Sequence, residues 1–140
     1  MGKSAVVLII DANHSMNKPI QDNDDGGGGG FWQDNAGAST TIINGSIDDN
    51  KAKGRGAGFF NHAGAVTITG PGTSISNNTV MSSQRGGGAF WNESGEISIT
   101  ATDGLGHMDG NKATEHGGAF YMNNRGTAVL DGITLDNNAT

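Results

Sequence analysis

Several residue types and patterns are missing from this sequence, and each absence excludes a class of structure. There is no cysteine, which rules out disulfide bonds and thiolate metal sites but fixes no compartment. No segment approaches the roughly 20 apolar residues of a membrane span, so no span is expected. Lys and Arg number only 8 against 14 Asp and Glu, giving a net charge of −6, and they are scattered. A nucleic-acid partner is therefore not expected.

A signal peptide is also missing at the N-terminus. The apolar run Val6–Ile10 is too short for the hydrophobic segment of one, and Asp11 ends it. The sequence thus predicts either an intracellular chain or a mature or excised piece of a longer protein.

Aliphatic residues and phenylalanine are scarce enough to be compatible with disorder, but those present are regularly spaced. The segment 86–92, Gly-Gly-Gly-Ala-Phe-Trp-Asn, recurs at 117–121 and in looser form at 28–32 and 56–60. The phenylalanines at 31, 59, 90 and 120 are separated by 28, 31 and 30 residues. Such a period is typical of solenoids, propellers and arrays. A disordered chain has no reason to keep this phase, so we expect a repeat fold.

Each repeat combines three short segments: a glycine-aromatic piece, a Val-x-Ile piece and an apolar-x-x-Asn piece. Turn-forming Gly, Asn and Asp separate them, and Gly and β-branched residues interrupt every candidate helix. Three strands per unit without tight hairpins favour a coil over a meander. The Val-x-Ile pieces lie at 41–45, 66–70, 97–100 and 128–132, after a first apolar strand at 5–11.

These features predict an all-β fold, namely a right-handed, three-sided parallel β-helix of about five coils. A single domain covers residues 1–140. Its predicted units are an irregular first coil at 1–27 and successive repeats at 28–55, 56–85, 86–116 and 117–140.

One asparagine ends the third piece of every repeat. Because these residues share one phase, we predict that their side chains stack on successive coils and hydrogen-bond along the axis as a ladder. Asparagine also tolerates left-handed backbone geometry. The alternative is that asparagine is merely common in this sequence. The predicted ladder is Asn23, Asn50, Asn78, Asn111 and Asn138.

The alternation of a Gly-Gly-Ala-apolar motif with an apolar-x-x-Asn motif resembles the repeats of polymorphic outer membrane proteins and related β-helical adhesins. In that family the motifs read GGAI and FxxN. The first appears here at 87–90 and 117–120, and the second begins at Ile20, Ile47 and Ile75. Phe replaces the aliphatic residue of the first motif, and aliphatic residues or Met replace Phe in the second. The resemblance implies a β-helix and an extracellular or cell-surface location, and it suggests adhesion.

Four aromatic pairs mark the glycine-aromatic strands. Successive strand residues point to opposite faces. If Phe31, Phe59, Phe90 and Phe120 point inward, their neighbours form an outward column. Such a column could stack sugar rings or be covered by another chain; alternatively, it packs under the protein's own loops or on itself. The predicted column is Trp32, Phe60, Trp91 and Tyr121.

No active site is evident, and we expect neither an enzyme nor a cofactor. Enzymatic β-helices that degrade polysaccharides need clustered carboxylates or Asp/Glu with Arg/Lys on one face. The glycine-aromatic strands offer only Asn61, Asn92 and Asn123. The histidines share no spacing, which argues against a metal site or catalytic base. An acidic edge could hold calcium weakly, although a solvated turn is the simpler interpretation. The histidines are His14, His62, His107 and His116. The acidic edge would consist of Asp22, Asp24, Asp25, Asp48 and Asp49.

Two further patterns are weaker. A fragment of a threonine array of the kind that orders ice is interrupted by Val129 and Asp131; its members are Thr67, Thr69, Ser98 and Thr100. Five N-glycosylation sequons mainly reflect the abundance of Asn, Ser and Thr. They lie at Asn13, Asn44, Asn77, Asn92 and Asn138.

Two functions from different classes remain open: a structural surface module that self-associates, and a carbohydrate-binding or adhesive module that uses the aromatic column. The first is favoured because neither end looks capped. The chain starts almost at once in the apolar strand Val6–Ile10 and stops where the next glycine-aromatic strand would be due. End-to-end stacking of copies would give a filament. An excised segment of a longer stalk would have the same two open ends.

Overall fold

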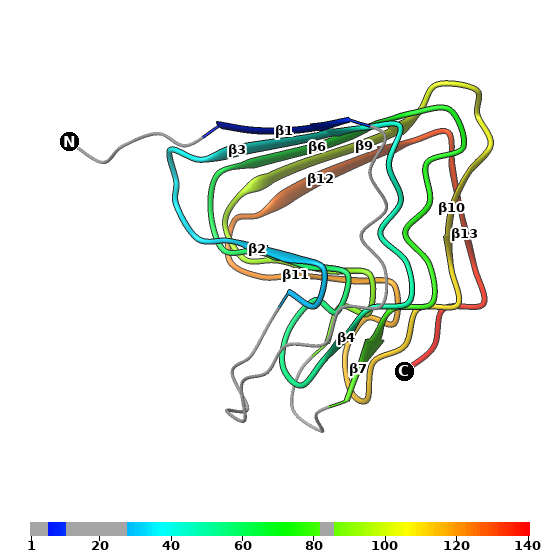
Figure 1. Ribbon diagram of the computed structural model, residues 1–140. Coiled ribbons are helices and arrows are strands. Elements are labelled where there is room, and N and C mark those ends of the chain that lie inside the picture. The colour runs from blue at the N-terminus through cyan, green and yellow to red at the C-terminus, as the bar shows by residue number, and fades with distance from the viewer. Residues whose placement is uncertain (1–5, 11–27, 82–85) are drawn as a thin grey trace.

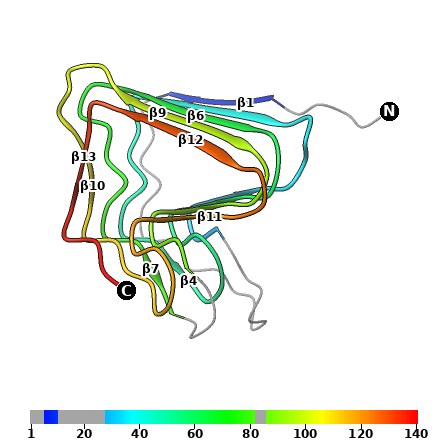
Figure 2. The same cartoon turned by 180° about the vertical axis from the view of Figure 1, so that it is seen from behind.

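A computed structural model gives the structure of the chain and describes residues 6–10, of which only the backbone, 28–81 and 86–140. Throughout these ranges the fold is all-β, without a helix, and its parallel sheets stack as a β-solenoid of about three turns. Figures 1 and 2 show the coils lying side by side, with the long strands along one side of the molecule. The all-β, parallel solenoid predicted from the repeats is therefore confirmed.

The long sheet is built from the Val-x-Ile pieces. Its strands follow the order β1-β3-β6-β9-β12, and every neighbouring pair is parallel. Ile42 pairs with Ile68, and Ile68 with Ile99, so like residues stack in columns. Burial alternates along these strands, which is the pattern of a sheet with one face on the core. The strands are β1 (Val6–Ile10), β3 (Ser39–Ile43), β6 (Ala65–Gly70), β9 (Glu96–Ala101) and β12 (Thr127–Asp131).

The glycine-aromatic pieces form a second parallel sheet, in the order β11-β8-β5-β2. Its strands are β2 (Phe31–Gln33), β5 (Phe59–Asn61), β8 (Phe90–Asn92) and β11 (Phe120–Met122). The phenylalanines stack on the core side, as predicted. Neighbouring ring centroids from Phe31 to Phe120 are 4.8, 5.1 and 5.1 Å apart. Phe59 and Phe90 are fully buried.

The predicted third strand is only partly correct. Met108 and Leu135 lie in a two-stranded parallel pair, β10 (Gly106–Asp109) with β13 (Ile133–Asp136). The equivalent segments at Ile47 and Ile75 form isolated bridges instead. A separate short pair, β4 (Lys51–Ala52) with β7 (Thr79–Val80), follows the ladder asparagine. The equivalent segment at Ile20 lies outside the described residues.

A glycine three residues before each core phenylalanine explains the glycine runs. Gly28, Gly56, Gly87 and Gly117 all have left-handed φ angles, between 54° and 74°. At Gly56 a Cβ atom would lie 1.9 Å from the carbonyl oxygen of Phe59, so a side chain is sterically excluded. The repeated motif is thus a turn that starts the strand.

The last coil leaves its core residues open. Met108 pairs with Leu135 in the same inward column, but Met108 is fully buried and Leu135 is 46% exposed. The phenylalanine and isoleucine columns likewise end in half-buried Phe120 and Leu130. Among the described strands, β11, β12 and β13 are each the last of their sheets, so no described strand pairs with the outer edge of this coil.

Candidate functional site

The residues of the predicted aromatic column are aligned with one another on successive strands. Trp32 pairs with Phe60, Phe60 with Trp91, and Trp91 with Tyr121 on successive strands of the glycine-aromatic sheet. The Trp32 and Phe60 rings meet edge to face at 5.1 Å, and the Trp91 and Tyr121 rings are tilted at 4.3 Å. The edge-to-face arrangement of Trp32 and Phe60 is one that aromatic pairs prefer.

The prediction that this column is exposed is wrong for two of its four members, Phe60 and Trp91. Phe60 is 2% and Trp91 is 5% exposed, whereas Trp32 is 49% exposed and Tyr121 is half-buried. The Arg55 guanidinium lies 5.7 Å from the Phe60 ring centre and 5.2 Å from that of Trp91. The protein's own cation therefore occupies the middle of the column, and only Trp32 presents a large free surface.

A charged row that the sequence analysis missed runs beside the aromatic column. Asp34, His62 and Glu93 each follow directly after a strand of the same sheet, so the coils bring them together. His62 Nδ1 hydrogen-bonds Asp34 Oδ1, and its Nε2 lies 3.8 Å from Glu93 Oε2. Arg55 lies 3.8 Å from the same carboxylate oxygen. The spacing of the histidines could not indicate this row, because the neighbours of His62 on the adjacent coils are the acids Asp34 and Glu93.

A polar column inside the solenoid was also missed. Gln33, Asn61 and Asn92 end their strands with side chains buried, not beside the outer aromatic column where the sequence analysis had placed Asn61 and Asn92. Gln33 Nε2 donates to Asn61 Oδ1 at 3.1 Å, and Asn61 Nδ2 donates to Asn92 Oδ1 at 3.1 Å. Two-residue alternation from each phenylalanine would have placed them on the core side. On the last strand Met122, not Asn123, pairs with Asn92. Asn123 follows the strand, and its backbone N–H donates to Asn92 O.

The predicted asparagine ladder forms over its described members. Asn50, Asn78 and Asn111 each donate from Nδ2 to Oδ1 of the next asparagine at 3.0 Å, ending on Asn138. Asn23 lies outside the described residues. The left-handed residues are not the ladder asparagines but those before them, namely Asp49, Asn77, Gly110 and Asn137. The ladder side chains point inward because the preceding residue makes the turn.

Of the acidic edge considered for calcium, only Asp48 and Asp49 lie in the described residues. Asp48 Oδ1 accepts hydrogen bonds from the Ser74 hydroxyl at 2.8 Å and the Ser76 amide at 2.7 Å. Asp22, Asp24 and Asp25 lie outside the described ranges. Within those ranges no three His, Cys, Asp or Glu side chains are placed to hold a metal ion.

The remaining sequence patterns have clear positions. Thr67 and Thr69 align with Ser98 and Thr100, and the array ends at Val129 and Asp131, as expected. Of the sequons, Asn92 is fully buried and cannot accept a glycan in the folded chain. Asn44 and Asn77 are exposed, Asn138 is a half-buried ladder member, and Asn13 is not described.

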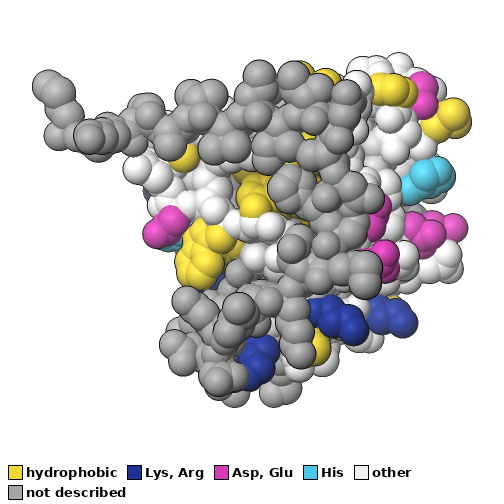
Figure 3. Space-filling view, in the orientation of Figure 1, with side chains coloured by type: hydrophobic (Ala, Val, Ile, Leu, Met, Phe, Trp, Pro, Cys, Tyr) yellow, Lys and Arg dark blue, Asp and Glu magenta, His cyan; other side chains and the backbone are white. Residues whose placement is uncertain are grey.

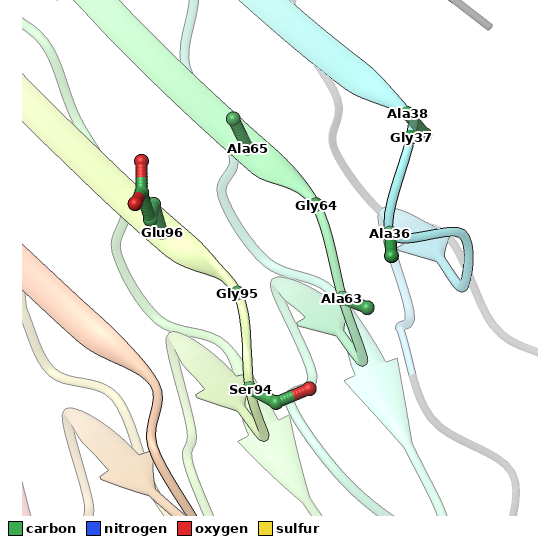
Figure 4. A pocket seen from close by; sticks show the side chains of 9 residues that line it. All are labelled: Ala36, Gly37, Ala38, Ala63, Gly64, Ala65, Ser94, Gly95 and Glu96. Carbon is green, nitrogen blue, oxygen red and sulfur yellow. The ribbon is translucent and has the colours of Figure 1, made fainter. Parts of the chain in front are cut away.

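A groove lies at the turn between the glycine-aromatic sheet and the long sheet. Its larger hollow has a volume of about 390 Å³ and is lined by 36–38, 63–65 and 94–96, the same turn on three successive coils (Figure 4). A smaller hollow of about 210 Å³ lies next to it, lined by Trp32–Asn35 and Ala38–Thr40. Ala38 lines both, so we treat them together as the corner groove.

Comparisons with protein-family models, with characterised proteins and with solved structures give no significant match. The search for long apolar helices over the described residues finds no candidate to cross a bilayer.

Proposed function

We propose that this chain is a non-enzymatic structural module, a right-handed β-helix of five coils that extends by end-to-end stacking of copies. The five strands of the long sheet support the number of coils, and right-handedness follows the strong preference of parallel crossovers. An extracellular or cell-surface place for such a module rests on the resemblance of its motifs alone.

The observation that carries the proposal is the exposure of Leu135. It occupies the same column as buried Met108, and no described strand pairs with β13 on its far side. At about 25 cal/mol per Å² of apolar surface, covering an end coil is favourable for any coil of matching shape. A second copy supplies a coil built from the same columns.

The two ends of the long sheet are compatible with a head-to-tail contact. β1 and β12 are its edge strands, and both run in the same direction. A translated copy would bring β1 beside β12 as one more parallel pair. Such a heterologous contact does not close and propagates as a filament.

The asparagine ladder fits the same arrangement. Each described asparagine from Asn78 to Asn138 accepts from the backbone N–H of the preceding ladder residue at 3.0–3.1 Å. By repetition, Asn138 N–H would donate to the next coil's asparagine. The stacked copy would thus extend hydrogen bonds as well as apolar contacts.

Sedimentation velocity and negative-stain microscopy across a concentration series test the proposal. The wild-type chain is expected to form rods of one width that lengthen with concentration. Leu135→Lys should abolish rods while the far-ultraviolet circular dichroism stays that of a β protein. Leu105→Lys is the matched control, because Leu105 is 65% exposed in the loop between β9 and β10.

A wild-type chain that stays a folded monomer at high concentration would contradict the proposal. So would rods that persist in Leu135→Lys, or that disappear equally in Leu105→Lys.

A further inference from the structure

The corner groove owes its shape to unequal turns. Five residues, 34–38, join β2 to β3, whereas three residues join β5 to β6 and β8 to β9. The longer turn is held in place by its own hydrogen bonds: Gly37 N donates to Asn35 Oδ1 at 2.9 Å, and Ala38 N donates to Asn35 O at 2.8 Å. The longer turn therefore forms one side of the groove, and small residues, mainly Ala63, Gly64 and Gly95, form its floor.

An exposed indole lies at one end of this groove. Trp32 is 49% exposed although its ring packs edge to face on buried Phe60. The contact with Phe60 fixes the ring, so little side-chain entropy remains to be lost when a ligand stacks on it. In Figure 3 hydrophobic side chains are visible near the β2 end of the described surface, with an acidic side chain beside them.

Each of the two hollows of the groove carries one carboxylate. Asp34 and Glu96 are exposed carboxylates, and Glu96 lines the larger hollow. His62 is 47% exposed and bridges the Asp34 and Glu93 carboxylates. Ser94 lies on the floor, where its hydroxyl donates to His62 O at 2.7 Å. The smaller hollow, at Trp32, thus has a mainly apolar lining with one carboxylate, and the larger hollow mixes polar and apolar surface and carries a second carboxylate.

The geometry points to a binding site for a neutral oligosaccharide in the corner groove, with Trp32 as the stacking surface. The apolar C–H face of a pyranose ring matches an indole, and its hydroxyl groups donate to carboxylates in charge-assisted hydrogen bonds. Acidic glycans would meet like charges at Asp34 and Glu96. A quaternary ammonium needs several aromatic walls, and only one ring is free here.

This site differs from the aromatic ladder expected from the sequence. Arg55 covers Phe60 and Trp91, so a sugar chain cannot follow the column along the sheet. It can lie instead across the turns of three coils, over Ala38, Ala65 and Gly95. Binding here does not depend on stacking of copies, so the two proposals can fail separately.

Native affinity electrophoresis tests the site, using gels that contain xylan, a β-1,3-glucan or galactomannan, with polygalacturonate as the acidic comparison. At least one neutral polysaccharide should retard the chain, and polygalacturonate should not. Calorimetry with the matching hexasaccharide should show a loss of affinity of about tenfold or more in Trp32→Ala, because the stacking surface is removed. Glu96→Gln and Asp34→Asn should each weaken binding without removing Trp32.

The matched control is Leu105→Ala, which removes an even more exposed apolar side chain outside the groove. Its affinity should equal that of the wild type. Circular dichroism of every variant separates lost binding from lost folding; should Trp32→Ala unfold, Glu96→Gln decides the matter. No retardation by any neutral polysaccharide, preferential binding of polygalacturonate or of a Lys-rich peptide, or unchanged affinity in both Trp32→Ala and Glu96→Gln would overturn the assignment.

Discussion

Asn78 Nδ2 donates to Asn111 Oδ1 at 3.0 Å, and both side chains are fully buried inside the solenoid. Asn78 also donates to Ile47 O at 2.8 Å and accepts from the Asn50 amide at 3.0 Å. One side chain thus satisfies backbone groups on the preceding coil and an asparagine on the next. This makes the ladder the polar counterpart of the phenylalanine stack.

We expect Asn78→Ala to destabilise the chain by about 2–4 kcal/mol, because it leaves several buried donors and acceptors without partners. Urea unfolding followed by circular dichroism measures the change. Asn137→Gly is the control: Asn137 is exposed and has a φ of 49°, so glycine should be neutral or slightly stabilising there. Equal destabilisation by both variants would argue against a special role for the ladder.

A pair of glycines separates backbone strain from steric exclusion. Gly56 and Gly72 have φ angles of 55° and 58°. A Cβ at Gly56 meets the Phe59 carbonyl oxygen at 1.9 Å, whereas at Gly72 nothing lies within 4 Å. Gly72→Ala should therefore cost about 1–2 kcal/mol, the usual penalty of a left-handed alanine.

Gly56→Ala should cost clearly more than Gly72→Ala, because it adds displacement of the strand to the same strain. The comparison of their urea midpoints measures the difference directly. If the two variants were equally stable, close packing of the coils would not be the reason for the repeated glycine.

The sequence determines the coils more fully than the surface. Phase alone located the phenylalanine stack and the ladder, since Phe59 and Asn78 each recur once per repeat and stacking follows from that. Whether the segments near Ile47 and Ile75 form strands could not be predicted. Two short segments form either a continuous strand pair or a single bridge, depending on turns of unequal length. Covering of Trp91 could not be predicted either, as Arg55 lies in a turn without any repeated pattern.

The charged row shows the same distinction. Asp34, His62 and Glu93 are different residue types, so no motif joins them, and only the register places them next to one another. The one shared feature in the sequence is that each of the three residues directly follows a side-chain amide, Gln33, Asn61 or Asn92, at the end of its strand. The corner groove had no such signal, because it arises from the difference in length between one turn and its neighbours.

Removal of Arg55 should expose the buried part of the aromatic column. In a Trp32→Phe background, where Trp91 is the only indole left, Arg55→Ala should raise acrylamide quenching of the fluorescence and shift its emission to longer wavelength. The loss of the cation–π contacts and the partly exposed ion pair should cost about 1 kcal/mol. Arg125→Ala, an exposed arginine beyond β11, is the control and should change neither. Quenching that stays constant in Arg55→Ala would mean that other groups shield Trp91.

The loop between β9 and β10 should respond to acid. Hydrogen bonds from the backbone N–H groups of Gly72 and Leu105 hold the pKa of Asp103 below its ordinary value. Because the folded pKa is depressed, the stabilisation is fully present above the unfolded pKa, about 4, and is lost as pH falls through the lower folded pKa.

The stability difference between wild type and Asp103→Ala should therefore be constant near neutrality and shrink at acidic pH. Urea midpoints measured from pH 7 to pH 2.5 test this. A wild-type advantage that grew on acidification would contradict the assignment.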